Sequence, residues 1–240
     1  MSDVEALASF IDKWRARWPE WRVAEVFVPQ AQRDAVQAWF ALRQELLDAA
    51  WGGVDPVPGE AKLAWWAEEL QGWSQGRRRH PLGIALQRLP APWPLLAAGL
   101  PALRASRERA ADTAQAITVL LPFAEGVVET AALLFACGTP VSAANLAVGL
   151  LAEQVLMQGD AAVPLRARAQ LGDAMPEYAA ARAWANELLQ RWPPPDGSRP
   201  DRIHAALLRE RLRCFAAGST ASEPLSRWRA LWTAWRAARG

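Results

Sequence analysis

The sequence predicts an all-α protein with a single domain spanning residues 1–240. Apolar residues recur at three- and four-residue steps in nearly every segment, as they do along one face of a helix. Almost no segment alternates polar and apolar residues as a strand would. A hydrophobic fraction of 52% over 240 residues is enough for one large core. No linker long enough to separate two domains and no internal repeat are visible, so a single helical bundle is expected.

The clearest helix begins near Gly59. Its apolar residues share one face and are Leu63, Trp66, Leu70 and Trp73. Glu68 and Glu69 are expected on the solvent side of this helix. Gly76 ends the pattern, three arginines follow, and His80-Pro81 prevents the helix from continuing. This order predicts a helix, a basic turn and a second helix beginning at Leu82.

The remaining helices follow in order, separated by segments rich in glycine and proline. They are expected over 4–18, 29–51, 95–100, 103–117, 116–137, 141–157, 178–192, 203–212 and 225–235. Ser142 is placed to be the N-cap of the helix over 141–157. Segment 159–172 is expected to be an irregular loop with a short turn of helix. In the helix over 203–212, Arg209, Arg211 and Arg213 are assigned to the polar face.

Composition excludes several classes of function. A net charge of +2 does not predict binding to nucleic acid. The chain has two cysteines and starts without a basic and apolar leader, so a cytoplasmic protein without disulfides is expected. Pro122, Glu125 and Glu129 interrupt the apolar window 116–137, and Glu153 lies within the shorter window 141–157. Both windows are therefore interpreted as core helices and not as membrane spans.

The histidines do not suggest a metal site, whereas the tryptophans suggest which faces are buried or bind a partner. His80 and His204 lack a cysteine or histidine partner at metal-ligand spacing, so no metal site is expected. No phosphate-binding glycine loop is present. Most of the 14 tryptophans are expected in the core. Trp228, Trp232 and Trp235 are interleaved with arginines, so they form either a docking surface for a partner or a membrane, or the packing face of a last helix.

The run KLAWWAEELQGWSQGRRRHPLGIALQRL (62–89) resembles the squalene/phytoene synthase family, whose members carry a similar RL-x-WW…G…HP…AL stretch. Segment 38–59 occupies the place of the family's first acidic helix. Segment 159–173 is similar to its GR-x-YLP…G loop. The resemblance implies an isoprenoid synthase type of bundle around a central cavity, in a family associated with terpenoid biosynthesis.

The resemblance also implies where an active site would lie. In the family, two aspartate pairs on facing helices hold Mg²⁺ for the diphosphate leaving group. In this chain the first pair falls near Leu47 and Trp51, with Asp48 and Glu45 close by. The second pair falls near Leu151 and Val155 and leaves Glu153, which is out of phase. Arginines that could bind a diphosphate are Arg43, Arg77 and Arg79.

Segment 45–66 is more similar to a branch of the family that includes the complex I assembly factor and its bacterial relatives, which lack a full acidic pair. The leading hypothesis is therefore a pseudoenzyme that needs no cofactor and binds a partner protein or an apolar isoprenoid-like ligand. The alternative is an active head-to-head prenyl transferase for farnesyl or geranylgeranyl diphosphate, with Mg²⁺ and with Asp48, Glu45 and Glu153 as its acidic site. A third hypothesis is peripheral membrane attachment through Trp228, Trp232 and Trp235.

Overall fold

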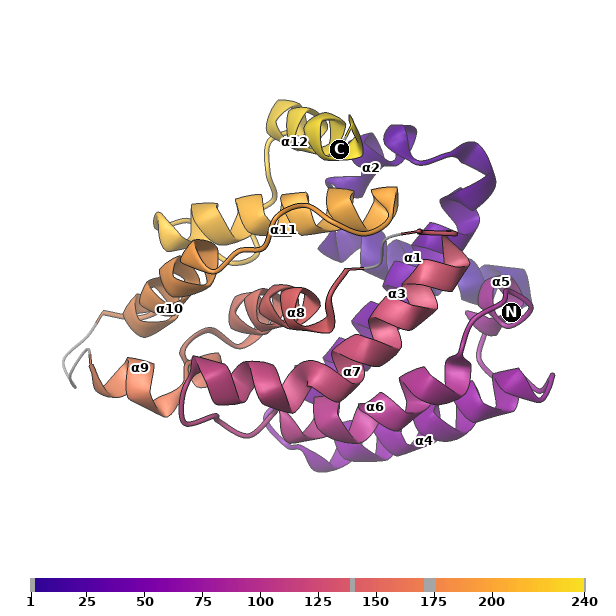
Figure 1. The fold of residues 1–240 in the computed structure, drawn as a ribbon, viewed down its shortest axis with the longest axis horizontal. Coiled ribbons are helices and arrows are strands. Elements are labelled where there is room, and N and C mark those ends of the chain that lie inside the picture. Colours follow the sequence, from indigo (N-terminus) through magenta and orange to yellow (C-terminus); the bar gives the residue numbers. More distant parts are fainter. Residues whose placement is uncertain (1–2, 139–140, 171–175, 240) are drawn as a thin grey trace.

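A computed structural model describes residues 3–138, 141–170 and 176–239, and every regular element in these ranges is helical (Figure 1). The α-helices are α1 (Asp3–Arg17), α2 (Trp21–Ala24), α3 (Arg33–Trp51), α4 (Val57–Ser74), α5 (Gly83–Leu86), α6 (Trp93–Ala105), α7 (Thr113–Leu134), α8 (Ala143–Gln158), α9 (Leu165–Ala169), α10 (Ala179–Gln190), α11 (Arg199–Ala216) and α12 (Arg227–Arg239). Short 3₁₀ turns lie at Glu25–Phe27, Gln30–Gln32 and Gly159–Ala162. The predicted all-α class is confirmed.

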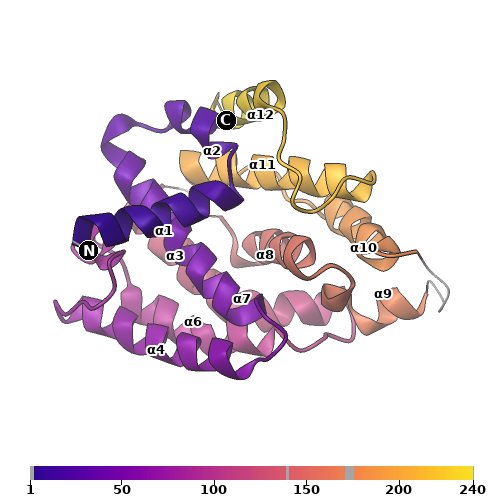
Figure 2. The same ribbon diagram turned by 180° about the vertical axis from the view of Figure 1, so that it is seen from behind.

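The helices pack in two groups around α8. On one side α4, α6 and α7 lie next to one another, with α3 between them and α1 (Figures 1 and 2). On the other side α10 and α11 pack together, and α12 lies over α11 and α2. Helix α8 contacts both groups through α7 and α11. Side chains on α8 are therefore placed at the centre of the molecule.

Glycines allow α6 and α7 to approach closely. A Cβ at Gly126 would lie 2.9 Å from the Cα of Leu96, and a Cβ at Gly99 would lie 2.7 Å from the Cα of Phe123. Real Cβ atoms do not tolerate such distances, so the two backbones can touch only where side chains are missing. This contact positions α7 against the core.

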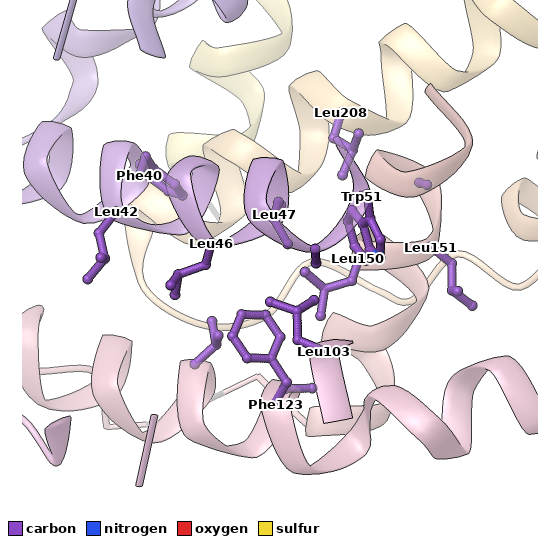
Figure 3. Close-up of a cluster of buried hydrophobic side chains, with 14 of the residues drawn as sticks. Phe40, Leu42, Leu46, Leu47, Trp51, Leu103, Phe123, Leu150, Leu151 and Leu208 are labelled. Atoms are coloured by element: carbon purple, nitrogen blue, oxygen red, sulfur yellow. The ribbon is translucent and has the colours of Figure 1, made fainter. Parts of the chain in front are cut away.

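An apolar cluster fills the space between α3, α6, α7 and α8. Leu47 and Trp51 of α3 point toward Leu103, Phe123 and Leu150 in this cluster (Figure 3). All five side chains are at most 3% exposed. The Trp51 indole donates a hydrogen bond to Ser106 Oγ over 3.0 Å, so its polar atom is satisfied inside the core.

Some predicted helices differ from the observed ones. The helix expected over 103–117 is wrong, because α6 ends at Ala105 and α7 begins at Thr113. Asp112 has extended backbone angles and caps α7, accepting a hydrogen bond from the Gln115 amide over 3.0 Å. Ser142 caps α8 as predicted. The helix expected from Leu82 is the single turn α5, and part of the predicted loop 159–172 lies outside the described residues.

Helix α7 is long and apolar enough to cross a membrane by length and composition. It carries Glu125 and Glu129, and it packs along α6 on one side and α8 on another. A core helix of a helical bundle has the same properties, and the packing favours that interpretation.

Candidate functional site: an arginine-lined cavity at the end of the bundle

Glu45 of α3 is neutralised by two lysines. Its carboxylate is 3% exposed and accepts hydrogen bonds from Lys13 Nζ over 2.5 Å and from Lys62 Nζ over 2.6 Å. Burial alone would raise the pKa of Glu45, but the two lysines outweigh it and hold this pKa below its usual value. Glu45 therefore joins α1 and α4 to α3 as an ionised, fully paired group.

Asp48, one turn further along α3, points in the same direction. It accepts from Arg17 over 2.9 Å and from Gln44 over 2.8 Å, and it lies 3.1 Å from Lys13 Nζ. Glu45 and Asp48 thus share a cationic environment supplied largely by α1. The third predicted carboxylate, Glu153, does not join them, because it pairs instead with Arg43 and His204.

The positions at which the resemblance predicts two aspartate pairs are apolar and buried. Leu47, Trp51, Leu151 and Val155 are each at most 3% exposed. Within the described ranges no three carboxylate, histidine or cysteine side chains come together as a metal would require. The residues present do not fit Mg²⁺, because the carboxylates of Glu45, Asp48 and Glu153 are already paired with lysine, arginine or histidine side chains.

Glu153 forms a buried polar cluster with Arg43 and His204. Glu153 Oε1 accepts from Arg43 Nη2 over 3.2 Å and lies 3.3 Å from His204 Nε2. The three side chains come from α8, α3 and α11, and each is at most 6% exposed. A charge at this depth is tolerated only when it is paired, so the cluster fixes the three helices relative to one another.

The protonation state of the cluster follows from its surroundings. Burial raises the pKa of Glu153, but hydrogen bonding to His204 and the charge of Arg43 outweigh it, and the pKa is lowered overall. Burial among Trp18, Trp21 and Phe40 lowers the pKa of His204 despite its carboxylate partner. The cluster is therefore an ionised Glu153 between a charged Arg43 and a neutral imidazole.

A cavity of about 720 Å³ opens beside this cluster, between α7, α8, α11 and α12. Small-molecule sites commonly measure about 300–1,000 Å³. Its apolar wall is formed by α7, α8 and α11, with Val127, Val128, Ala131, Leu146 and Leu208 among its residues. Arg43, Glu153 and His204 line its buried end. The Nε of Arg43 is buried and makes no hydrogen bond within the described part of the chain.

The cavity is strongly basic toward its mouth. Seven arginines line it, against four carboxylates. Two of the carboxylates, Glu153 and Glu210, are already paired with arginines. Six of the arginines come from the last two helices and are Arg202, Arg209, Arg213, Arg229, Arg236 and Arg239. An apolar wall with an arginine-rich rim suits an anionic group attached to an apolar chain.

A second hollow, of about 540 Å³, lies on the other side of Glu153. Arg17, Gln44 and Arg211 line it together with residues of the α8 end and the segment before α12. Glu153 lines both hollows. Of the three predicted acidic residues it is therefore the only one that lines either of them.

The predicted basic turn, residues 77–79, lies away from both hollows. Glu69 organises it, accepting from the backbone amides of Arg79 and His80 over 2.7 and 2.8 Å and from Arg79 Nε over 3.0 Å. The prediction that Glu69 faces solvent is wrong, because it is 1% exposed and also accepts from the Trp73 indole. Arg77 is exposed and bonds to the Gln75 side chain. Neither Arg77 nor Arg79 lines a described cavity.

Arg211 was also expected on a polar face and is instead buried. It donates to both carboxylate oxygens of Glu20, over 2.9 and 2.7 Å, and lies 4.3 Å from the Trp18 ring centroid. Glu20 also accepts from the Leu225 amide over 2.8 Å. This pair ties the start of the chain to α11 and to the segment that leads into α12.

The last helix, α12, exposes two of its three tryptophans, as a docking surface would require. Trp228 is 81% exposed and Trp232 is 59% exposed, while Trp235 is half-buried. Small residues make the contact with the bundle instead, since Ala230 and Ala234 are the buried residues of α12. The other prediction, that the last helix packs on the bundle through its tryptophans, therefore applies only to Trp235.

Sequence reasoning did not assign His204 or the α11 arginines to a site, and it considered the α12 arginines only as part of a docking surface. One signal was available, because His204 lies on the same helix face as Ile203, Leu207 and Leu208 and is therefore directed inward. Another was the run Ser198-Arg199-Pro200-Asp201, a capping box that fixes where α11 begins. No family model, curated protein or solved structure matches this chain.

Proposed function

We propose that this protein is a non-catalytic member of the squalene/phytoene synthase family. In this proposal it binds an isoprenoid-like ligand, an apolar chain with an anionic head, in the cavity between α7, α8, α11 and α12. No cofactor takes part. Arg43 and the arginines of α11 and α12 bind the head, and the apolar wall holds the chain.

The observation that carries the proposal is the lining of the cavity. Its volume of about 720 Å³ suits a small molecule, its wall is apolar, and its charged groups are mostly arginines. Arg43 lines the buried end of this cavity and supplies a cation there. A small ligand, more than a partner protein, accounts for a hollow that reaches inward to the buried side chains of Arg43, Glu153 and His204.

The carboxylates support binding without catalysis. Glu45 and Asp48 are held by Lys13, Lys62 and Arg17, and Glu153 is held by Arg43 and His204. A Mg²⁺ ion would have to displace these cations before it could bind a diphosphate. The arrangement therefore favours a binding protein over the active prenyl transferase.

The proposal is tested by titrating the protein with farnesyl diphosphate and with farnesol, which lacks the anionic head. We expect saturable binding of the diphosphate that is about tenfold or more weaker in the double variant Arg209→Gln/Arg236→Gln, because both arginines are exposed and line the cavity. The matched control is Arg166→Gln/Arg168→Gln on α9, whose arginines do not line it. Equal loss of affinity in both variants would contradict the proposal.

A further inference from the structure

The exposed face of α12 has an unusual composition for the surface of a bundle. Trp228 and Trp232 are four residues apart, so they lie on one face, and they are the two exposed tryptophans among the 14 of the chain. Trp232 stacks on Trp235 with ring centroids 4.7 Å apart, and Arg239 lies 4.7 Å from the Trp235 ring centroid. Exposed aromatic residues that are this close together mark an interaction surface.

The charge of this face has one sign. Helix α12 contains four arginines and no acidic residue. Glu210 of α11 pairs with Arg229, and exposed Glu223 lies before the helix. Arg227 and Arg236 make no ion pair with any described residue. Arg209 and Arg213 extend the basic surface onto α11, although Arg213 is paired with Glu210. An anionic surface would complement this patch.

We infer that α12 is a membrane-docking helix that binds the headgroup layer of an anionic lipid bilayer. Indole rings are favoured at this depth, where one edge is apolar and the other is wet, and arginines bind the phosphates beside them. Four arginines are spread along α12 and its buried residues Ala230 and Ala234 pack on the bundle, so it would lie in the plane of the interface.

The cavity gives a reason to favour a lipid surface over a protein partner. Trp232, Trp235, Arg236 and Arg239 line the cavity as well as the exposed side of α12. Docking through α12 therefore brings the cavity mouth to the lipid layer, where an apolar ligand with an anionic head would be found. Entry of the ligand from the membrane rests on the proposed function. Docking of α12 to the membrane does not depend on it.

The test uses the full chain and vesicles of phosphatidylcholine alone or mixed with phosphatidylglycerol. We expect the protein to float with the mixed vesicles and not with phosphatidylcholine alone, and we expect added salt to weaken binding. Trp228→Ala/Arg227→Gln should reduce binding about tenfold or more. Both side chains are exposed and neither lines the cavity, so the fold and the cavity should be unaffected.

The matched control is Leu165→Ala/Arg166→Gln on α9, an exposed apolar and basic pair on a different side of the molecule (Figures 1 and 2). It should bind vesicles like the wild type. Failure of the wild type to bind mixed vesicles, or equal binding by Trp228→Ala/Arg227→Gln, would overturn the inference. Binding of farnesyl diphosphate without vesicles reports on the cavity separately, so the failure of one idea is distinguishable from that of the other.

Discussion

Glu69 concentrates four hydrogen bonds on one buried carboxylate. Glu69→Gln removes the negative charge and replaces one acceptor oxygen with an NH₂ donor, which would face either Arg79 Nε at the Oε2 position or the amides and the indole at the Oε1 position. We expect this variant to lower the free energy of unfolding by about 2–3 kcal/mol. The neighbouring Glu68 forms an exposed ion pair with Arg79 at 3.5 Å, and exposed ion pairs contribute little to stability. Glu68→Gln should therefore change the free energy of unfolding by less than about 0.5 kcal/mol. Urea denaturation compares the two, and equal effects would contradict this role of Glu69.

His80 makes stability depend on pH. Its ring lies 4.4 Å from the ring centroids of both Phe10 and Trp66, and burial lowers its pKa from 6.5 to about 4. Between these values the unfolded chain binds a proton that the folded chain does not, so the free energy of unfolding falls as the pH falls from 6.5 to 4. His204 contributes in the same direction.

His80→Asn isolates the contribution of His80. Asparagine keeps an acceptor for the Leu82 amide, which now donates to His80 Nδ1 over 3.2 Å, but it does not titrate. We expect the decline in the free energy of unfolding from pH 7 to pH 4 to become shallower in the variant, as measured by urea denaturation at several pH values. An unchanged slope would contradict this role, because it would mean that His80 binds a proton as readily in the folded protein as in the unfolded chain.

Glu69 and Arg211 also show where sequence patterns fail at single residues. Helical periodicity assigns charged side chains to solvent unless a partner is known. The partners of Glu69 are amides of residues that follow the helix, and the partner of Arg211 is Glu20, 191 residues away. A pattern within one helix contains neither contact.

At the scale of elements, the contact between α6 and α7 depends on missing side chains. Gly126→Ala would place a Cβ 2.9 Å from the Leu96 Cα, so the helices must separate. We expect a loss of about 1–3 kcal/mol in the free energy of unfolding. Gly149 in α8 is the matched control, because its nearest neighbour is a Leu208 methyl at 3.8 Å. Gly149→Ala should raise stability by about 0.5–1 kcal/mol. A stable Gly126→Ala variant would contradict the close contact.

Most elements could be predicted because their signals are local. The apolar stripes of α1, α3, α4 and α11 are periodic, and Ser142 is followed at once by the helix that it caps. The break at 106–112 could not be predicted because its charged residues fit the polar face of one continuous helix. Asp112 fits that face as well, although in the structure it caps α7. The cavity itself could not be predicted, since its walls come from helices that are distant in sequence.

At the scale of the whole molecule, the bundle separates charge from the apolar core. Lysines and arginines neutralise the carboxylates of α3, while the basic cavity lies at the other end of the polar cluster formed by Arg43, Glu153 and His204. The squalene/phytoene synthase resemblance predicts a diphosphate site near Leu47, Trp51, Leu151 and Val155, but these side chains are apolar and buried. The proposed ligand site is instead the cavity lined by arginines, which suits binding of an anionic group without a metal.

The most direct test of this account is a calorimetric titration with farnesyl diphosphate in Mg²⁺ and in EDTA, followed by an assay of the same samples for free diphosphate. The account predicts saturable binding with the same affinity in both buffers and no diphosphate release. Release of diphosphate that depends on Mg²⁺ would contradict it.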